Sequence, residues 1–406
     1  MTLEHLSTLF PAVDFVDAHR RLAVDDERRR AAGAGTAGLD PIALSVGAAA
    51  VTIRPGTSVE IVDGVDDDAT CVVVFTSAAA FSDFHNELRS VPGVQLSGGI
   101  TYERGGYAEF DGWEPALRAL YQGRPVYDPA DHDGARAARS FVHGVDPVEV
   151  VGAHVRAHGF AVVRDVFSAD EVAALDAALT RLEQESTPDT LATWWTTDAN
   201  GTARPCQIHY VTQRAPETAW IESDPRMTAL VEASNPGLVP HPDRGNGVFA
   251  VLKHPGAKGG MTDLPWHIDC GLGGHTLLCP GIHIGVQLTA SNPAVGAFAV
   301  LAGSHESSVR RAEVDESTWP VVVADTQPGD VTIHVTHAFH AAPPPTGAGP
   351  GRRTLYLGYG RQEAYDAIGA GRSFDDLLSD TADDGFVSFD ARITRSAIDS
   401  GGSERP

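Results

Sequence analysis

Lysine is almost absent from this chain of 406 residues, because only Lys253 and Lys258 occur and arginine supplies the other positive charges. Lysine and arginine together number 30 against 54 aspartate and glutamate residues, which gives a formal net charge of −24 at pH 7. A chain this acidic has little basic surface with which to bind a phosphate backbone or an anionic membrane. We therefore expect neither a nucleic acid nor a membrane as a partner.

Long hydrophobic runs and clustered cysteines are also missing. No segment approaches the ~18 uninterrupted apolar residues of a membrane-spanning helix. The first residues, MTLEHLSTLFPAVDF, lack the basic segment and apolar core of a signal peptide. The four cysteines, Cys71, Cys206, Cys270 and Cys279, are scattered along the chain, which is typical of a reducing compartment where thiols stay free. The sequence thus predicts a cytoplasmic protein.

The first 125 residues have the pattern of a separate unit. A charged, helix-favouring segment ends near Gly33, and the β-rich runs VTIRPG (51–56), SVEIVDG (58–64) and CVVVFTS (71–77) are separated by turn residues, which predicts an antiparallel meander. The segment VQLSGGITYERGG predicts a further hairpin, and PALRALYQG predicts a closing helix that stops at Gly123.

This pattern of strands followed by helices resembles the sterol-carrier-protein fold over roughly residues 37–125. The resemblance implies an apolar ligand cavity, or a domain reused for dimerisation or substrate docking; a structural appendage without a ligand is the alternative. We expect a sterol-carrier-like domain with an N-terminal helix at 1–125, a polar linker at 126–146, and a second domain at 147–406. The expected fold class is α+β with two domains.

The sequence pattern of the second domain changes along its length. Ser168 and Glu171 form a capping-box pattern that opens an amphipathic helix. After about residue 247 the chain consists of short β-runs separated by Gly/Pro loops: VFAVLK, HIGVQL, FAVLAGSH, DVTIHV and RTLYLGY. Many short strands with turn signals predict a barrel or a double-sheet jelly roll with flanking helices.

Histidine and aspartate lie two residues apart in the segment LPWHIDC, at His267 and Asp269. On a strand the two side chains face the same way, so both can reach one ion. A later segment, DVTIHVTHAFHAAPPP, offers His334, His337 and His340 as a third ligand. Two histidines and one carboxylate on one face of Fe(II) leave positions for a co-substrate and dioxygen. The alternative is a histidine that merely hydrogen-bonds a neighbouring aspartate at a strand end.

The segments VLKHPG, LPWHIDC, VGAFAVLAGSHESS, QPGDVTIHVTHAFHAAPPP and PGRRTLYLGY follow one another in this order. Over roughly residues 147–365 they resemble the phytanoyl-CoA dioxygenase family of Fe(II)/2-oxoglutarate-dependent oxygenases. The resemblance implies a double-stranded β-helix, and His267, Asp269 and His340 as catalytic metal ligands. It also implies an arginine at the start of the last strand as the anchor of 2-oxoglutarate. Because neighbouring strand residues face opposite ways, only one of Arg352 and Arg353 can serve. In the family the arginine lies about a dozen residues past the distal histidine, so the resemblance implies Arg352.

Lys253, in the segment VLKHPG, is the expected second contact of 2-oxoglutarate, with a solvated surface lysine as the alternative. The family resemblance implies Fe(II), 2-oxoglutarate and O₂ as cofactor and co-substrates. It further implies oxidation, in the first place hydroxylation, of an unactivated C–H bond in a small apolar or natural-product-type molecule of secondary metabolism. A homodimer is left open.

Two other functions compete for these residues. A zinc-dependent enzyme could use the cluster His267, Cys270, His275, Cys279 and His283, since thiolate and imidazole suit zinc. The C-x₈-C spacing matches none of the usual zinc patterns, however, and it leaves His340 and Arg352 unexplained. A non-catalytic lipid- or ligand-binding protein with a degenerate oxygenase fold is the second alternative, and the intact ligand set argues against it.

Overall fold

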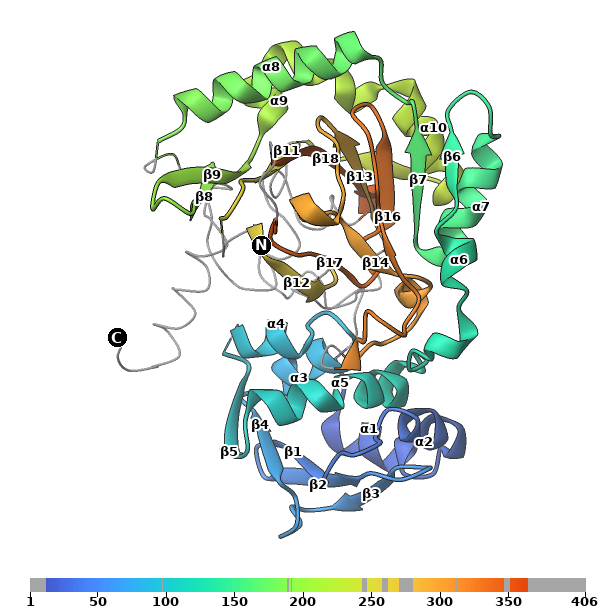
Figure 1. The fold of residues 1–406 in the computed structure, drawn as a ribbon. Helices are drawn as coiled ribbons and strands as arrows, with labels where there is room; N and C mark the ends of the chain where they lie inside the picture. Colours follow the sequence, from blue (N-terminus) through green and yellow to red (C-terminus); the bar gives the residue numbers. More distant parts are fainter. Residues whose placement is uncertain are drawn as a thin grey trace.

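The computed structural model describes residues 12–96, 98–187, 190, 192–242, 247–257, 262–269, 280–310, 313–346 and 351–363. These residues form a mixed α/β fold with a five-stranded, a nine-stranded and a four-stranded sheet. The five-stranded sheet and its helices lie at one end of the molecule, and the two other sheets lie at the opposite end (Figure 1).

The N-terminal unit packs helices against its five-stranded sheet, whose order is β3-β2-β1-β4-β5. Its elements are α1 (Phe15–Leu22), α2 (Asp26–Gly33), β1 (Ile42–Val46), β2 (Ala49–Arg54), β3 (Glu60–Asp63), β4 (Cys71–Phe75), α3 (Ala78–His85), α4 (Val91–Leu96), β5 (Ile100–Arg104) and α5 (Tyr107–Gln122). Helix α5 ends at Gly123, which has a φ of 71°, as expected from the sequence.

The expected antiparallel meander and hairpin are wrong in two respects. Strand β1 pairs antiparallel with β2 but parallel with β4, so the sheet is mixed. The residues VQL, expected in a hairpin, belong to α4, and β5 pairs antiparallel with β4 instead. The physical reason is burial. Val91 and Val94 belong to the same apolar core as the strands, and a helix packed against the sheet buries both side chains.

The segment expected to link the domains contains short elements of its own. These are η2 (Pro129–Asp131), α6 (Gly134–Ala137) and β6 (Ser140–Val142). Strand β6 extends the nine-stranded sheet by pairing in parallel with β7 (Phe160–Arg164).

The remaining described residues form two facing sheets with helices on the outside. Helices α7 (Val148–His158), α8 (Ala169–Glu185), α9 (Val211–Arg214), η3 (Pro216–Ser223) and α10 (Pro225–Ser234) precede most of the strands. The nine-stranded sheet runs β6-β7-β16-β13-β18-β11-β9-β8, with β10 (Leu238–Pro240) paired to β18. Its other strands are β8 (Thr193–Thr197), β9 (Ala203–Ile208), β11 (Phe249–Lys253), β13 (Ile282–Gln287), β16 (Val331–Val335) and β18 (Arg352–Arg361).

The four-stranded sheet has the order β12-β17-β14-β15. Its strands are β12 (Leu264–His267), β17 (His340–Ala342), β14 (Ala299–Leu301) and β15 (Val321–Val323), with η5 (Pro293–Val295) and η6 (Ser304–Glu306) between strands. Phe160 and Val162 of the larger sheet share an apolar cluster with Phe298 and Val300 of the smaller one, so the two sheets face each other.

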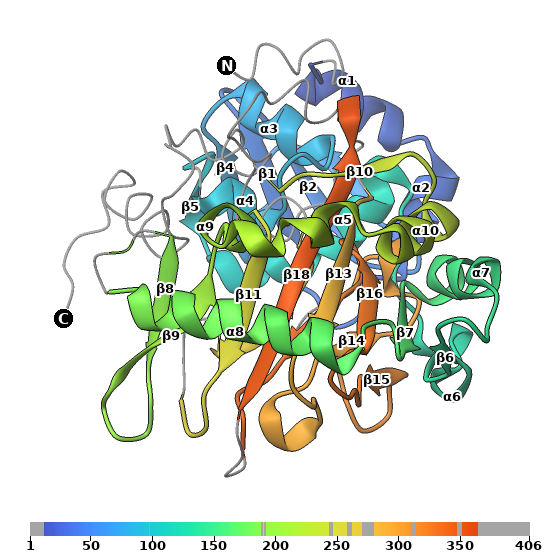
Figure 2. The same ribbon diagram turned by 90° about the horizontal axis from the view of Figure 1, so that it is seen from above.

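Alternation along the strands gives the nine-stranded sheet two different faces. The outer face carries residues such as Ile284, Leu355 and Leu357, which join one apolar core with residues of α7, α8 and α10. Figure 2 shows α8 lying across the central strands on this side. On β18 the alternate positions, such as Tyr356, therefore face inward toward the smaller sheet. The space between the two sheets thus holds polar side chains such as Arg352 as well as the apolar cluster that includes Phe298.

Two further expectations concern membrane-spanning helices and the cysteines. No helix within the described residues is long and apolar enough to cross a membrane. Cys71 is a buried free thiol and Cys206 is also buried, whereas Cys270 and Cys279 lie outside the described residues. His275 lies outside them too, so the cluster expected for a zinc enzyme is described only at His267 and His283.

Candidate metal and co-substrate site

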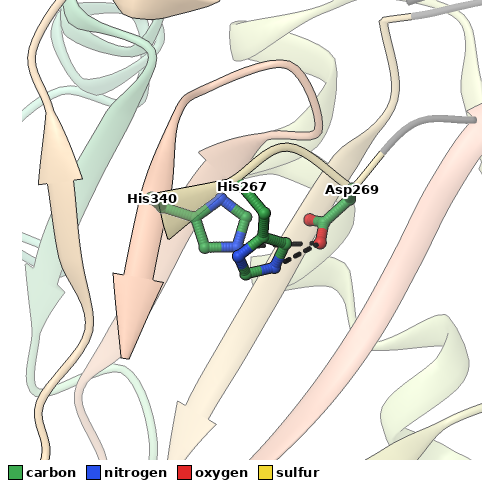
Figure 3. Close-up of side chains that lie close together, drawn as sticks. All are labelled: His267, Asp269 and His340. Atoms are coloured by element: carbon green, nitrogen blue, oxygen red, sulfur yellow. Dashed lines mark ion pairs between the residues drawn. The ribbon is translucent and has the colours of Figure 1, made fainter. Parts of the chain in front are cut away.

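His267 and His340 are brought together by strand pairing in the smaller sheet. Strands β12 and β17 are antiparallel, and His267 lies directly opposite His340 in the register. Their ring centroids are 4.3 Å apart. Asp269 follows β12, and its Oδ1 is 3.6 Å from Nε2 of each histidine. The three side chains therefore converge, as Figure 3 shows, and could hold one metal ion.

The backbone orients both imidazole rings. Nδ1 of His267 donates to the carbonyl oxygen of Pro265 at 2.7 Å, and Nδ1 of His340 donates to that of Ala338 at 2.8 Å. Since a carbonyl oxygen only accepts, the proton of each neutral ring is on Nδ1. The Nε2 lone pairs are left to face Asp269, which is the tautomer that a metal ligand needs.

The charge state of the cluster also suits a cation. Burial alone would raise the pKa of Asp269, but interactions with His340, His283 and His267 hold it well below its usual value. Burial holds the pKa of His340 well below the ordinary value for histidine. The carboxyl group is thus ionised and the imidazole of His340 neutral, the forms in which both bind metals.

Two further histidines contact the other oxygen of the same carboxylate. Nδ1 of His283 and Nε2 of His334 each lie 3.1 Å from Oδ2 of Asp269. The hydrogen bond to Asp269 places the His334 ring beside the three candidate ligands. The sequence interpretation considered His283 only in the zinc alternative. Its position next to the Asp269 carboxylate was missed, although the alternation in HIGVQL places His283 on the inner face. His337 is also buried. Among the described residues, two groups of side chains lie close enough together to hold a metal ion, and His337 belongs to neither: His267, Asp269 and His340, and Asp269, His283 and His334.

Arg352 is buried on the inner face of β18, with only 2% of its surface exposed. Its Nε donates to Thr354 Oγ1 at 3.0 Å, one terminal nitrogen to the carbonyl oxygen of Gly296 at 2.7 Å, and the other to the hydroxyl of Tyr356 at 2.9 Å. Three of its five N–H groups are used in this way, so each terminal nitrogen keeps one.

No carboxylate within the described residues forms an ion pair with Arg352, although a buried guanidinium needs a countercharge. Burial raises the pKa of Tyr356, so the phenol keeps its proton and can donate it to an anion. The remaining donors of Arg352 and Tyr356 therefore suit the carboxylate of an acidic co-substrate. Thr354 and Tyr356 were missed by sequence reasoning; the signal was their spacing of two and four residues from Arg352, which places all three on one face of the strand.

Arg353 has a different environment, on the outer face of the same strand. It forms ion pairs of 2.7 Å with Asp176 and 2.9 Å with Glu183, both on α8. The guanidinium also donates to Thr180 at 3.0 Å. With its partners on the covering helix, Arg353 does not reach the interior, and the geometry favours Arg352 as the anion-binding residue.

Lys253 is opposite Arg352 in the register of β11 and β18, and it is buried. Its Nζ donates to the carbonyl oxygens of Thr262 at 2.7 Å, Ala342 at 2.5 Å and Pro343 at 2.7 Å. These contacts use all three hydrogens of the ammonium group. Lys253 thereby ties β11 to the segments that precede β12 and end β17, the two strands that carry His267 and His340.

Comparisons with known proteins address the same region. Residues 155–354 match the family model of the phytanoyl-CoA dioxygenases. No curated protein sequence matches the chain.

Similar solved structures include AviO1 from Streptomyces viridochromogenes Tue57, with 23% identity over 53% of this chain and 96% of that one, at a TM-score of 0.43. Another is the epimerase SnoN in complex with Fe³⁺, α-ketoglutarate and nogalamycin RO, with 18% identity over 53% and 83% of the two chains and a TM-score of 0.41. A third is EctD from S. alaskensis with bound Fe, with 21% identity over 59% and 83% and a TM-score of 0.42. Residues 155–354 are thus a domain of the phytanoyl-CoA dioxygenase family, and the chain is a 2-oxoglutarate-dependent non-haem iron oxygenase.

Proposed function

We propose that His267, Asp269 and His340 hold the iron of this oxygenase and that Arg352 binds the distal carboxylate of 2-oxoglutarate. The observation that carries the proposal is the pairing of His267 with His340, which sets both Nε2 atoms 3.6 Å from one oxygen of Asp269. When bound, Fe(II) would couple the reduction of dioxygen to oxidative decarboxylation of 2-oxoglutarate and to oxidation of a C–H bond.

The residues around this site have separate tasks. Two imidazoles and one carboxylate occupy one face of the ion, so the opposite face remains for co-substrate and dioxygen. Arg352 orients the keto acid with its two remaining N–H groups, and Tyr356 adds an O–H donor. The ring of Phe298 lies 4.8 Å from that of His334 and 5.2 Å from that of His340, so it excludes water from this side of the cluster. Lys253 remains a candidate second contact of 2-oxoglutarate, if it exchanges one carbonyl for a carboxylate.

We propose hydroxylation of an unactivated C–H bond in a small apolar or natural-product-type molecule as the reaction. The net charge of −24 supports this class, because an acidic surface repels anionic polymers. We further propose that residues 1–125 form a sterol-carrier-like domain that docks the substrate, with 126–146 as the connection to the oxygenase domain at 147–406. The strand order β3-β2-β1-β4-β5 and a separate apolar core support a unit of its own.

The test combines binding and turnover. Anaerobic addition of Fe(II) and 2-oxoglutarate should produce the weak visible charge-transfer band of the chelated keto acid, which a non-catalytic carrier would lack. Succinate formation from 2-oxoglutarate is then measured across a panel of hydrophobic candidates, and stimulation by one of them identifies the substrate class. His267→Ala should abolish both signals; turnover that survives this change would show that the ligand assignment is wrong.

A further inference from the structure

We propose that His283 and His334 are positioning residues that hold Asp269 by its Oδ2, so that Oδ1 alone faces the metal. The inference deepens the proposed function and rests on Asp269 being a ligand of the iron. It assigns a role to two histidines of the larger sheet that the ligand set itself does not use.

The carboxylate of Asp269 lies between the two sheets and is shared by them. Oδ1 faces His267 and His340 of the smaller sheet, at 3.6 Å from each Nε2. Oδ2 lies 3.1 Å from one nitrogen of His283 and one of His334, which are register partners on β13 and β16. The backbone N–H of Asp269 adds a third tie to the region of β16, because it donates to the carbonyl oxygen of Thr336 at 2.9 Å.

The surroundings of His334 show that its polar ring is retained for this contact. The side chain is buried against the rings of Phe298, at 4.8 Å, and Tyr356, at 6.4 Å. Its Nε2 bonds Asp269, whereas its Nδ1 is a buried nitrogen without a hydrogen-bond partner in the structure. A buried imidazole whose second nitrogen is unsatisfied costs stability that a phenylalanine here would not, so the bond to the carboxylate accounts for its presence.

Room for His283 is provided by a glycine on the neighbouring strand. His283 lies opposite Gly358 of β18. A Cβ at this position would come within 3.2 Å of Nε2 of His283 and 2.5 Å of Nε2 of His241. Glycine weakens a strand interior, and one common reason for its presence there is the close approach of another group. The local sequence of β18 thus accommodates this ring.

Two donors on Oδ2 have a definite consequence for metal binding. They compete with an ion for the lone pairs of that oxygen, and so favour a carboxylate that binds through Oδ1 only. A chelating carboxylate would take one of the positions that co-substrate and dioxygen require. Partners of metal ligands typically change metal affinity or activity about 10–100-fold when they are removed.

The test measures Mn(II) binding to the full-length, metal-free protein by electron paramagnetic resonance. His283→Phe and His334→Phe remove the donors and should each weaken Mn(II) binding about 10-fold or more. An amide can replace each donor: the nitrogen of asparagine mimics Nδ1 of His283, and that of glutamine mimics Nε2 of His334. His283→Asn and His334→Gln should therefore recover most of the Mn(II) affinity. Their Fe(II)/2-oxoglutarate charge-transfer band should lie where it does in the wild type.

Matched controls separate this role from a structural one. His154→Phe makes the same change on α7, where the ring bonds the carbonyl oxygen of Ala137, and should leave Mn(II) affinity unchanged. If the phenylalanine variants do not fold, His334→Asn compared with His334→Gln decides, because the shorter amide does not reach Asp269.

Equal Mn(II) affinity in that pair, or wild-type affinity in the phenylalanine variants, would overturn the inference. So would a second Mn(II) ion per chain that is lost with His283 or His334, since these histidines would then be ligands themselves. Failure of the proposed function looks different: His267→Ala would then still bind Mn(II) as the wild type does.

Discussion

At the scale of single residues, Asp269 is the meeting point of the site. Four imidazoles surround its carboxylate, two from each sheet, and their contacts keep it ionised despite burial. Arg352 is the second fixed charge, and it has no carboxylate partner within the described residues. In the proposed site the negative group, Asp269, would bind the iron and the positive group, Arg352, would bind 2-oxoglutarate.

Arg352 and Arg353 provide a matched pair of substitutions. Arg352→Leu removes charge-assisted hydrogen bonds worth about 1.5–3 kcal/mol each, so the KM for 2-oxoglutarate should rise about 100-fold. Arg353→Leu breaks only the ion pairs with α8 and should cost about 1 kcal/mol of stability without changing that KM. The measurement is succinate formation against 2-oxoglutarate concentration, and the opposite pattern would assign the anchor to Arg353.

Sequence reasoning at this scale reached the residues whose spacing is local. Strand alternation over a few residues predicted that His267 and Asp269 face the same way and that Arg352 and Arg353 face opposite ways, whereas the choice of Arg352 rested on its distance from His340 in the family resemblance. The contact of His283 with Asp269 could not be predicted in this way, because it depends on the register between strands that are far apart in the chain. The choice of His340 as the proposed distal ligand depended on the order of motifs shared with the family.

At the scale of elements, the inner face of β18 must leave room for large rings. Gly285 of β13 lies opposite Tyr356, and a Cβ there would come within 2.6 Å of Thr332 Oγ1 and 2.8 Å of the Tyr356 ring. The missing side chain of Gly285 therefore leaves the space that the Tyr356 ring needs.

Gly285→Ala should push the Tyr356 ring away from Arg352. We expect a loss of about 1–3 kcal/mol in the free energy of unfolding, as in other overpacked cores, and a higher KM for 2-oxoglutarate. Gly112→Ala on α5 is the control, because its Cβ would meet only Leu39 at 3.6 Å. That variant should be as stable as the wild type or up to about 1 kcal/mol more stable. Urea unfolding of both proteins compares them, and an unchanged Gly285→Ala protein would contradict the packing.

Helix α1 carries a buried histidine that makes the N-terminal unit sensitive to acid. His19 donates through Nδ1 to the carbonyl oxygen of Phe15 at 2.8 Å, and its Nε2 lies 3.0 Å from the hydroxyl of Tyr121. Burial lowers its pKa from 6.5 to about 4. Since the folded state binds the proton less well than the unfolded one, stability is full above pH 6.5 and is lost as the pH falls toward 4.

The contribution of His19 should amount to about 2 kcal/mol between pH 7 and pH 5. His19→Phe leaves the Tyr121 hydroxyl without this acceptor, so it should be less stable at pH 7 but lose about 2 kcal/mol less on acidification. Urea unfolding at the two pH values measures this difference. An identical pH dependence in variant and wild type would show that His19 is not the responsible group.

The topology of the N-terminal sheet could be predicted only in part. Local patterns identified its strands β2, β3 and β4 and the end of α5 at Gly123. They did not reveal that β1 and β4 pair in parallel, because turn residues report on neighbouring strands and not on a crossover.

At the scale of the whole molecule, two apolar cores are separate. One surrounds the five-stranded sheet, and the other lies between the nine-stranded sheet and its covering helices. The connection includes the bond from the hydroxyl of Tyr127 to the carbonyl oxygen of Ala302 at 2.8 Å and that from Arg310 to the carbonyl oxygen of Ala37 at 3.2 Å. Because each unit has an apolar core of its own, we expect two cooperative units.

Calorimetry of the full chain should therefore show two unfolding transitions. Mn(II) with 2-oxoglutarate at about 100 times its Kd should stabilise only the oxygenase unit, by about 2.7 kcal/mol. The transition whose temperature Mn(II) and 2-oxoglutarate leave unchanged should be that of the N-terminal unit. Acidification should lower the temperature of this transition in the wild type but not in His19→Phe. A single transition, or equal shifts of both, would contradict independent units.

The most direct measurement is a crystal structure of the protein with Mn(II) and 2-oxoglutarate, with the ion located by its anomalous scattering. We predict one ion bound by Nε2 of His267, Oδ1 of Asp269 and Nε2 of His340, and a 2-oxoglutarate carboxylate on Arg352. An ion bound elsewhere, or a keto acid that does not contact Arg352, would contradict the proposed site.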